Sequence, residues 1–115
     1  MLQRLVKSIR YALRGLANVF RSEQNFRLQV LAAIVVVVGM LAFPLPLWQR
    51  VILILLIAAV LVLEVINTVF ERIVDRFKPR IHPVVGEIKD MMAAAVFLVS
   101  VVSAIIGILI FWPYV

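Results

Sequence analysis

Residues 51–75 are VILILLIAAVLVLEVINTVFERIVD, and this stretch decides the fold of the chain. Positions 51–63 are apolar and uncharged, which suits the hydrocarbon core of a membrane. From Glu64 to Asp75, polar residues recur at a helical spacing among Val, Ile and Phe. The stretch therefore predicts one long helix that crosses the membrane and then carries a polar face out of it.

The composition of the whole chain supports a membrane protein. Hydrophobic residues make up 65% of the 115 positions and the mean hydropathy is +1.14, whereas a soluble domain is about 45–50% apolar. These values argue against a water-soluble fold, and the length allows one domain, residues 1–115. The chain has no cysteine and one histidine, His82. Disulfides, cysteine-ligated metal centres and multi-histidine sites within one chain are thereby excluded.

The other elements follow from the placement of apolar and basic residues. Residues 2–21 predict an amphipathic helix at the membrane surface, because an apolar face lies opposite a face of arginine and lysine. Further spans are predicted at about residues 28–46 and 91–112, flanking the span at about 50–70. Ser22 is predicted to cap the helix that follows it, and Pro44 and Pro46 to end that helix. The expected fold is all-α, with one surface helix and three transmembrane helices.

Basic residues indicate the orientation in the membrane. Six Lys and Arg residues precede the first span, five lie within 72–89, and Arg50 lies in the first loop. The positive-inside rule therefore places the N-terminus and residues 72–90 in the cytoplasm. Anionic lipid headgroups are the simplest partner for the net charge of +6, and no basic–aromatic motif points to nucleic acid. All acidic residues fall on the cytoplasmic side: Glu23, Glu64, Glu71, Asp75, Glu87 and Asp90.

Four polar residues form a stripe along the predicted central helix. At about 100° per residue, Glu64, Asn67, Glu71 and Asp75 lie within an arc of about 80°. A carboxylate such as Glu64 at the end of an apolar span costs several kcal/mol unless it is paired or bound to metal, so the stripe is a candidate functional site. Two structural interpretations stay open, a solvated helix face or a network of the carboxylates with Lys89 and arginines.

The residue types in the stripe suit phosphoryl transfer. Carboxylates and an amide supply hard oxygen ligands, which Mg²⁺ prefers, and nucleotide phosphates commonly complete its shell. Lys89 and nearby arginines can neutralise other phosphate oxygens, and a further carboxylate can accept a proton from a lipid hydroxyl. The scattered glycines form neither a P-loop nor a G-x-G-x-x-G turn, so any ATP site must be built from side chains on helices.

The stripe also matches a known pattern, E-x-x-N-T-x-x-E-x-x-x-D, over residues 64–75. With the other matching residues, this pattern resembles the prokaryotic diacylglycerol kinase family, which also contains the undecaprenol kinases. The resemblance covers nearly the whole chain. It implies a homotrimer in the bacterial inner membrane, with active sites shared between neighbouring subunits at the cytoplasmic interface. The other matching residues are Arg14-Gly15-Leu16, Ser22-Glu23, Phe26-Arg27, His82-Pro83 and Ile88-Lys89-Asp90.

The resemblance further implies a reaction and its residues. The expected enzyme is an ATP- and Mg²⁺-dependent lipid kinase that converts diacylglycerol to phosphatidic acid, or alternatively undecaprenol to undecaprenyl phosphate. By resemblance, Glu64 is the catalytic base and binds the lipid substrate together with Asn67 and Arg4. Glu23 and Glu71 match the metal ligands. The residues that match the ATP-binding set are Glu23, Glu71, Asp75, Lys89 and Asp90.

Three features depart from the family pattern or stand outside it. Glu87 replaces a small or basic residue, and Met91-Met92 replace small residues, so both affect the expected nucleotide affinity. His82 is interpreted as a loop or interface residue. Two rival classes are a cation-conducting oligomer, which predicts acidic residues in more than one span, and a non-enzymatic helical partner of a larger complex, which leaves the stripe without a purpose.

Overall fold

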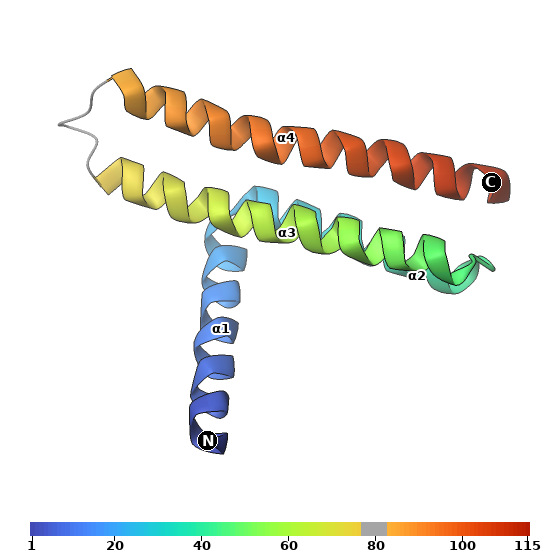
Figure 1. The fold of residues 1–115 in the computed structure, drawn as a ribbon, viewed down its shortest axis with the longest axis horizontal. Coiled ribbons are helices and arrows are strands. Elements are labelled where there is room, and N and C mark those ends of the chain that lie inside the picture. The colour runs from blue at the N-terminus through green and yellow to red at the C-terminus, as the bar shows by residue number, and fades with distance from the viewer. Residues whose placement is uncertain (77–82) are drawn as a thin grey trace.

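The computed structural model describes residues 1–76 and 83–115, and every element in those ranges is helical (Figure 1). The helices are α1, Leu2–Ser22; α2, Gln24–Ala42; α3, Leu47–Arg76; and α4, Pro83–Phe111, which is followed by the short 3₁₀ helix η2, Trp112–Tyr114. The prediction of an all-α protein is confirmed. His82 and the rest of the connection between α3 and α4 lie outside the described residues.

Three helical segments are long and apolar enough to cross a membrane, as the sequence predicted. They are α2, α3 and Val84–Tyr114, with 19, 30 and 31 residues. Figure 1 shows α3 and α4 running side by side in opposite directions, with α2 behind α3. α3 packs most extensively against α4 and also contacts α2. The helix that carries the polar stripe is therefore the central one of the three.

α1 runs roughly crosswise to the long helices, and the chain turns at one residue (Figure 1). Glu23 separates α1 from α2 and has extended backbone, with φ −115° and ψ 112°. The predicted cap by Ser22 is wrong. Ser22 is the last residue of α1, and its hydroxyl donates to the Asn18 carbonyl at 2.9 Å. A serine hydroxyl that is satisfied one turn back in its own helix does not cap the next one.

Residues 43–46 connect α2 to α3. Phe43 is extended, with φ −112° and ψ 148°, because a residue before proline is disfavoured in the helical region. The Pro46 carbonyl accepts hydrogen bonds from the N–H groups of Gln49 and Arg50 at 3.1 and 3.2 Å. α3 therefore begins at Leu47, directly after the second proline.

A small apolar core closes this end of the molecule. The Phe43 ring lies between those of Phe111 and Tyr114, with centroid separations of 6.0 and 5.5 Å. These rings join the loop after α2 to the end of α4 and to η2. The buried residues of this core are Met40, Leu45, Leu53 and Ile110.

Most apolar side chains on the long helices point away from the chain's own core. Leu41 on α2 is 79% exposed and Leu109 on α4 is 68% exposed. Exposing apolar surface to water costs about 25 cal/mol per Å². These faces therefore require lipid tails or other apolar helices as neighbours.

Candidate active site

Glu64 is buried within α3 although it carries a carboxylate. Its exposure is 4%, and Val60 and Thr68, one turn away on either side, are also buried. The Thr68 hydroxyl donates to the main-chain carbonyl of Glu64 at 2.9 Å, so its hydrogen-bonding partner lies within α3 and is not the Glu64 carboxylate. A charge taken out of water is costly without a partner, which makes Glu64 a candidate for chemistry at the end of the apolar part of α3.

Asn67 and Glu71 follow along the same helix. The Asn67 amide nitrogen Nδ2 donates to Glu71 Oε1 at 3.3 Å, across one helical turn. Both residues are half-buried. The amide therefore orients the Glu71 carboxylate on the helix face that also carries Glu64.

Glu23 reaches this group from the corner between α1 and α2. It is half-buried, and the charges of Glu23 and Glu71 both act on the carboxylate of Glu64. Carboxylates gathered in this way repel one another unless a cation or a proton intervenes. The three acidic residues form the centre of the candidate site.

Asp75 and Lys89 extend the site between α3 and α4. Lys89 Nζ lies 3.1 Å from Asp75 Oδ1, and the two side chains are 37% and 55% exposed. An ion pair this accessible to water contributes about 0–1 kcal/mol to stability. Because so little holds the pair together, Lys89 is available to an anionic ligand one helical turn beyond Glu71.

Glu23 and Glu71 fit the requirements of Mg²⁺. This ion typically takes one or two protein carboxylates and completes its octahedral shell with water and phosphate oxygens. Within residues 1–76 and 83–115, no group of three or more His, Cys, Asp or Glu side chains is arranged to hold a metal. A metal at this place would therefore depend on the phosphates of a nucleotide for further ligands.

Two of the predicted site residues lie farther out. Asp90 follows Lys89 on the exposed surface of α4. Arg4 lies near the start of α1, nineteen positions before Glu23, or roughly 28 Å along a helix. Within one chain the structure does not bring Arg4 to the other residues. The residues that it does gather are Glu23, Glu64, Asn67 and Glu71, with Asp75 and Lys89 one turn beyond.

Comparison with known proteins decides the class of the protein. The sequence model of the family described as prokaryotic diacylglycerol kinase matches residues 10–111. The chain belongs to this family. The kinase is 38% identical to the undecaprenol kinase of Bacillus subtilis, over 97% of this chain and 91% of that protein. It is 30% identical to the diacylglycerol kinase of Escherichia coli K12, over 96% and 91%, and 32% identical to that of Haemophilus influenzae, over 96% and 95%.

The predicted resemblance is thereby confirmed, and the chain is an integral-membrane lipid kinase that depends on ATP. Membership of this family removes the two rival classes, the cation-conducting oligomer and the non-enzymatic helical partner. A kinase family implies ATP as the phosphoryl donor and commonly a divalent cation. The carboxylates and the lysine of the candidate site are residue types that suit this chemistry.

The kinase also contains polar contacts near Glu23 that the sequence did not predict. Arg72 Nη2 donates to Ser22 Oγ at 2.6 Å, and Arg27 Nη1 donates to the carbonyls of Phe20 and Arg21 at 2.8 and 2.9 Å. Arg27 and Phe20 are seven residues apart in different helices, and Arg72 and Ser22 are fifty residues apart. Helical spacing therefore predicts neither contact. The position of Arg72 directly after Glu71 is the one hint in the sequence.

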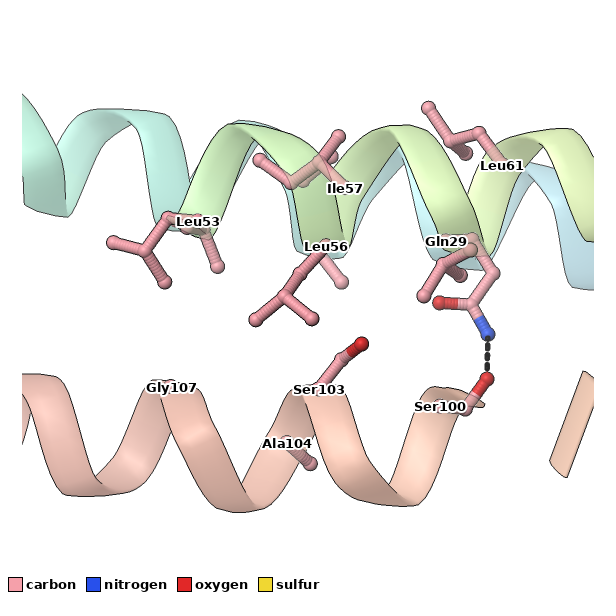
Figure 2. Close-up of a pocket in the computed structure, with 13 residues that line it drawn as sticks. Gln29, Leu53, Leu56, Ile57, Leu61, Ser100, Ser103, Ala104 and Gly107 are labelled. Carbon is pink, nitrogen blue, oxygen red and sulfur yellow. Dashed lines mark hydrogen bonds between the residues drawn. The ribbon is translucent and has the colours of Figure 1, made fainter. Parts of the chain in front are cut away.

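A cavity lies between α2, α3 and α4, apart from the acidic group (Figure 2). Its volume is about 170 Å³, and its walls are mostly apolar. Figure 2 shows Gln29 directed at Ser100, with Nε2 of Gln29 3.5 Å from the serine hydroxyl. None of the predicted site residues lines this cavity. We therefore treat it as a feature of helix packing, separate from the kinase site.

Proposed function

We propose that this kinase transfers the γ-phosphoryl group of ATP to the hydroxyl of a membrane lipid alcohol, with Glu64 as the general base. The observation that carries the proposal is the burial of Glu64 at the apolar end of an acidic group that includes Glu23 and Glu71. A base beside the apolar half of α3 suits a lipid hydroxyl. The carboxylates farther along suit a water-soluble nucleotide.

In the proposed step, the lipid hydroxyl oxygen forms a bond to the γ-phosphorus. The bond between that phosphorus and the bridging oxygen of ADP breaks, and ADP leaves with the electron pair. The hydroxyl proton moves to the Glu64 carboxylate, a role that typically contributes about 10²–10⁴ in rate. Asn67 contacts the lipid substrate beside Glu64. Positioning and charge neutralisation are enough for such a transfer, so no covalent enzyme intermediate is required.

The nucleotide is proposed to bind along α3 beyond Glu64. Glu23 and Glu71 hold the magnesium ion, which when bound neutralises charge on the phosphates. Lys89 exchanges its weak pairing with Asp75 for a phosphate oxygen, because charge-assisted contacts to phosphate are the stronger ones. Asp75 and Asp90 contact other parts of the nucleotide.

The working enzyme is proposed to be a homotrimer in the bacterial inner membrane, with its N-terminus in the cytoplasm. The exposed apolar faces of the long helices support contacts with further copies. The crosswise direction of α1 supports a helix that lies in the membrane surface. Arg4 lies too far along α1 to reach its own chain's site, so we assign it to the lipid site of a neighbouring subunit.

Diacylglycerol is the first proposed acceptor, with phosphatidic acid as the product. Undecaprenol is the alternative acceptor. It is supported by the identity with the undecaprenol kinase of Bacillus subtilis, 38%, which exceeds the 30% and 32% with the two diacylglycerol kinases. Both lipids present a hydroxyl next to a long apolar body. The same residues would therefore act on either one.

The proposal is tested with the purified kinase in lipid vesicles, using ATP labelled at the γ-phosphate. Separate vesicles contain diacylglycerol, undecaprenol or no added acceptor, and the lipids are separated by thin-layer chromatography. We expect a labelled lipid that forms from one of these acceptors and requires Mg²⁺. Absence of labelled lipid from both acceptors would contradict the proposed function.

A further inference from the structure

The corner that carries Glu23 is packed through the buried side chains of Val19 and Phe26 but makes few hydrogen bonds of its own. The Glu23 N–H donates to the Val19 carbonyl at 2.8 Å, and the Glu23 carbonyl accepts from the Arg27 N–H at 3.3 Å. The Glu23 side chain makes no capping hydrogen bond to either helix. Apolar packing leaves the orientation of the Glu23 carboxylate to polar groups from neighbouring residues.

Arg27 is the first of these groups. Its guanidinium donates to the carbonyls of Phe20 and Arg21 in the last turn of α1. Carbonyls in the last turn have no partner within their own helix, and a positive charge is favourable at that end. Arg27 belongs to the first turn of α2, so this contact ties the end of one helix to the start of the next.

Arg72 adds a connection from this corner to α3. The 2.6 Å bond between Arg72 Nη2 and Ser22 Oγ is the shortest side-chain hydrogen bond in the described part of the chain. The Ser22 hydroxyl donates its own proton to the Asn18 carbonyl at 2.9 Å, and its oxygen accepts the hydrogen bond from the Arg72 guanidinium. Ser22 comes directly before Glu23 and Arg72 directly after Glu71. One hydrogen bond thus joins the chain neighbours of both acidic residues.

We propose that the Ser22–Arg72 hydrogen bond is a latch that positions Glu23 with respect to Glu71 and so sets the affinity of the kinase for Mg²⁺·ATP. Ser22 and Arg72 are positioning residues in this scheme, because they act through the two carboxylates. The inference rests on the proposed function, in which Glu23 and Glu71 hold the metal.

Paired variants separate this role from a direct effect of the Arg72 charge. Ser22→Ala removes the acceptor and keeps the guanidinium. We expect Ser22→Ala and Arg72→Ala each to raise the KM for Mg²⁺·ATP about five-fold while kcat is retained, and the double variant to raise it no further. Ser22→Thr keeps a hydroxyl and serves as the matched control, with a KM close to wild type.

Two kinetic results would overturn the latch. A KM that rises in Arg72→Ala but stays unchanged in Ser22→Ala would mean that the arginine acts on the phosphates by its charge. A loss of folded protein and kcat in both variants, with unchanged KM, would mean that the bond serves stability alone.

A distance measurement tests the latch without relying on turnover. The chain has no cysteine, so spin labels can be attached to Lys7→Cys on α1 and Ile54→Cys on α3, which are both exposed. Labelled chains are diluted with unlabelled ones so that only pairs within one chain contribute. We expect a broader distance distribution in Ser22→Ala and Arg72→Ala than in Ser22→Thr.

The outcomes distinguish the two proposals. If the wild-type kinase phosphorylates lipid and the distance distribution is unchanged in Ser22→Ala and Arg72→Ala, the latch is overturned and the proposed function stays intact. Broadening in a protein that phosphorylates neither lipid would support the latch at α1 and overturn the proposed function.

Discussion

Glu23, Glu64 and Glu71 lie near the place where α3 changes from apolar to polar, and the charges of Glu23 and Glu71 oppose that of Glu64. Glu64 is the buried member, while Glu23 and Glu71 are half-buried. In the proposed mechanism, a divalent cation held by Glu23 and Glu71 would relieve this repulsion and leave Glu64 to take a proton. At the scale of single residues, the proposed roles thus place base catalysis at the buried Glu64 and metal binding at the half-buried Glu23 and Glu71.

Glu23→Gln and Glu71→Gln are expected to raise the Mg²⁺ concentration that gives half-maximal activity by about ten-fold or more. A neutral amide is a weaker ligand for Mg²⁺ than a carboxylate. Even substitution of residues that only hydrogen-bond to metal ligands typically lowers metal affinity or activity about 10–100-fold. Activity titrated against Mg²⁺ at fixed ATP gives this value. The control is Glu87→Gln, which removes an exposed carboxylate outside the proposed metal pair, and a saturating ATP concentration keeps any change in nucleotide affinity out of the comparison. Unchanged Mg²⁺ dependence in both test variants would argue against metal binding by these residues.

Lys89→Met is expected to raise the KM for ATP with a loss of stability below about 1 kcal/mol. The Lys89–Asp75 pair is too exposed to stabilise the fold by more than that. Initial rates against ATP and thermal unfolding in detergent supply the two quantities. A large loss of stability with unchanged KM would instead favour the structural network that the sequence left open.

At the scale of elements, regular patterns were predictable and local contacts were not. The length and the polar face of α3 follow from hydropathy and helical spacing, so Glu64, Asn67 and Glu71 could be identified from sequence. The approach of Glu23 to them could be stated from the family resemblance only, because it depends on a single-residue corner. The Ser22 cap failed because the hydroxyl has a competing acceptor in its own helix, the Asn18 carbonyl. Arg27 and Arg72 contact distant residues that no periodicity connects.

Gly39→Ala is expected to lower the free energy of unfolding by about 1 kcal/mol. A Cβ at this position of α2 would lie 3.0 Å from the Phe111 ring, and such overpacking costs about 1–3 kcal/mol. The helix propensity of alanine offsets about 1 kcal/mol of that cost. Thermal unfolding in detergent measures the difference. The loss should shrink in a Phe111→Leu background, and an equal loss in both backgrounds would show that the ring is not the cause.

At the scale of the whole molecule, the crosswise α1 and the three long helices suggest how the kinase sits in a bilayer. α1 branches from the bundle at Glu23, and α3 continues past that level to Arg76 (Figure 1). If α1 marks the membrane surface, then Glu64 lies near it and Asp75 lies beyond it. The orientation stays a prediction from Lys and Arg placement. Subunit contacts depend on shape complementarity that one chain's pattern does not encode.

A cysteine placed near the α1–α2 corner is expected to face the cytoplasm, and one placed at the first residue of α3 to face the opposite side. Gln24→Cys and Leu47→Cys serve this purpose, because both positions are exposed and the chain has no other cysteine. A membrane-impermeant maleimide added to intact cells should label Leu47→Cys alone. Labelling of Gln24→Cys under these conditions would reverse the proposed orientation.

Lipid phosphorylation by Glu64→Gln tests the central claim most directly. The variant is compared with wild type in vesicles that contain the lipid acceptor, with ATP binding and subunit assembly measured on the same preparations. Because glutamine cannot accept the hydroxyl proton, we expect kcat to fall by about 10²–10⁴ while assembly and ATP binding are retained. Full activity in Glu64→Gln would contradict the account.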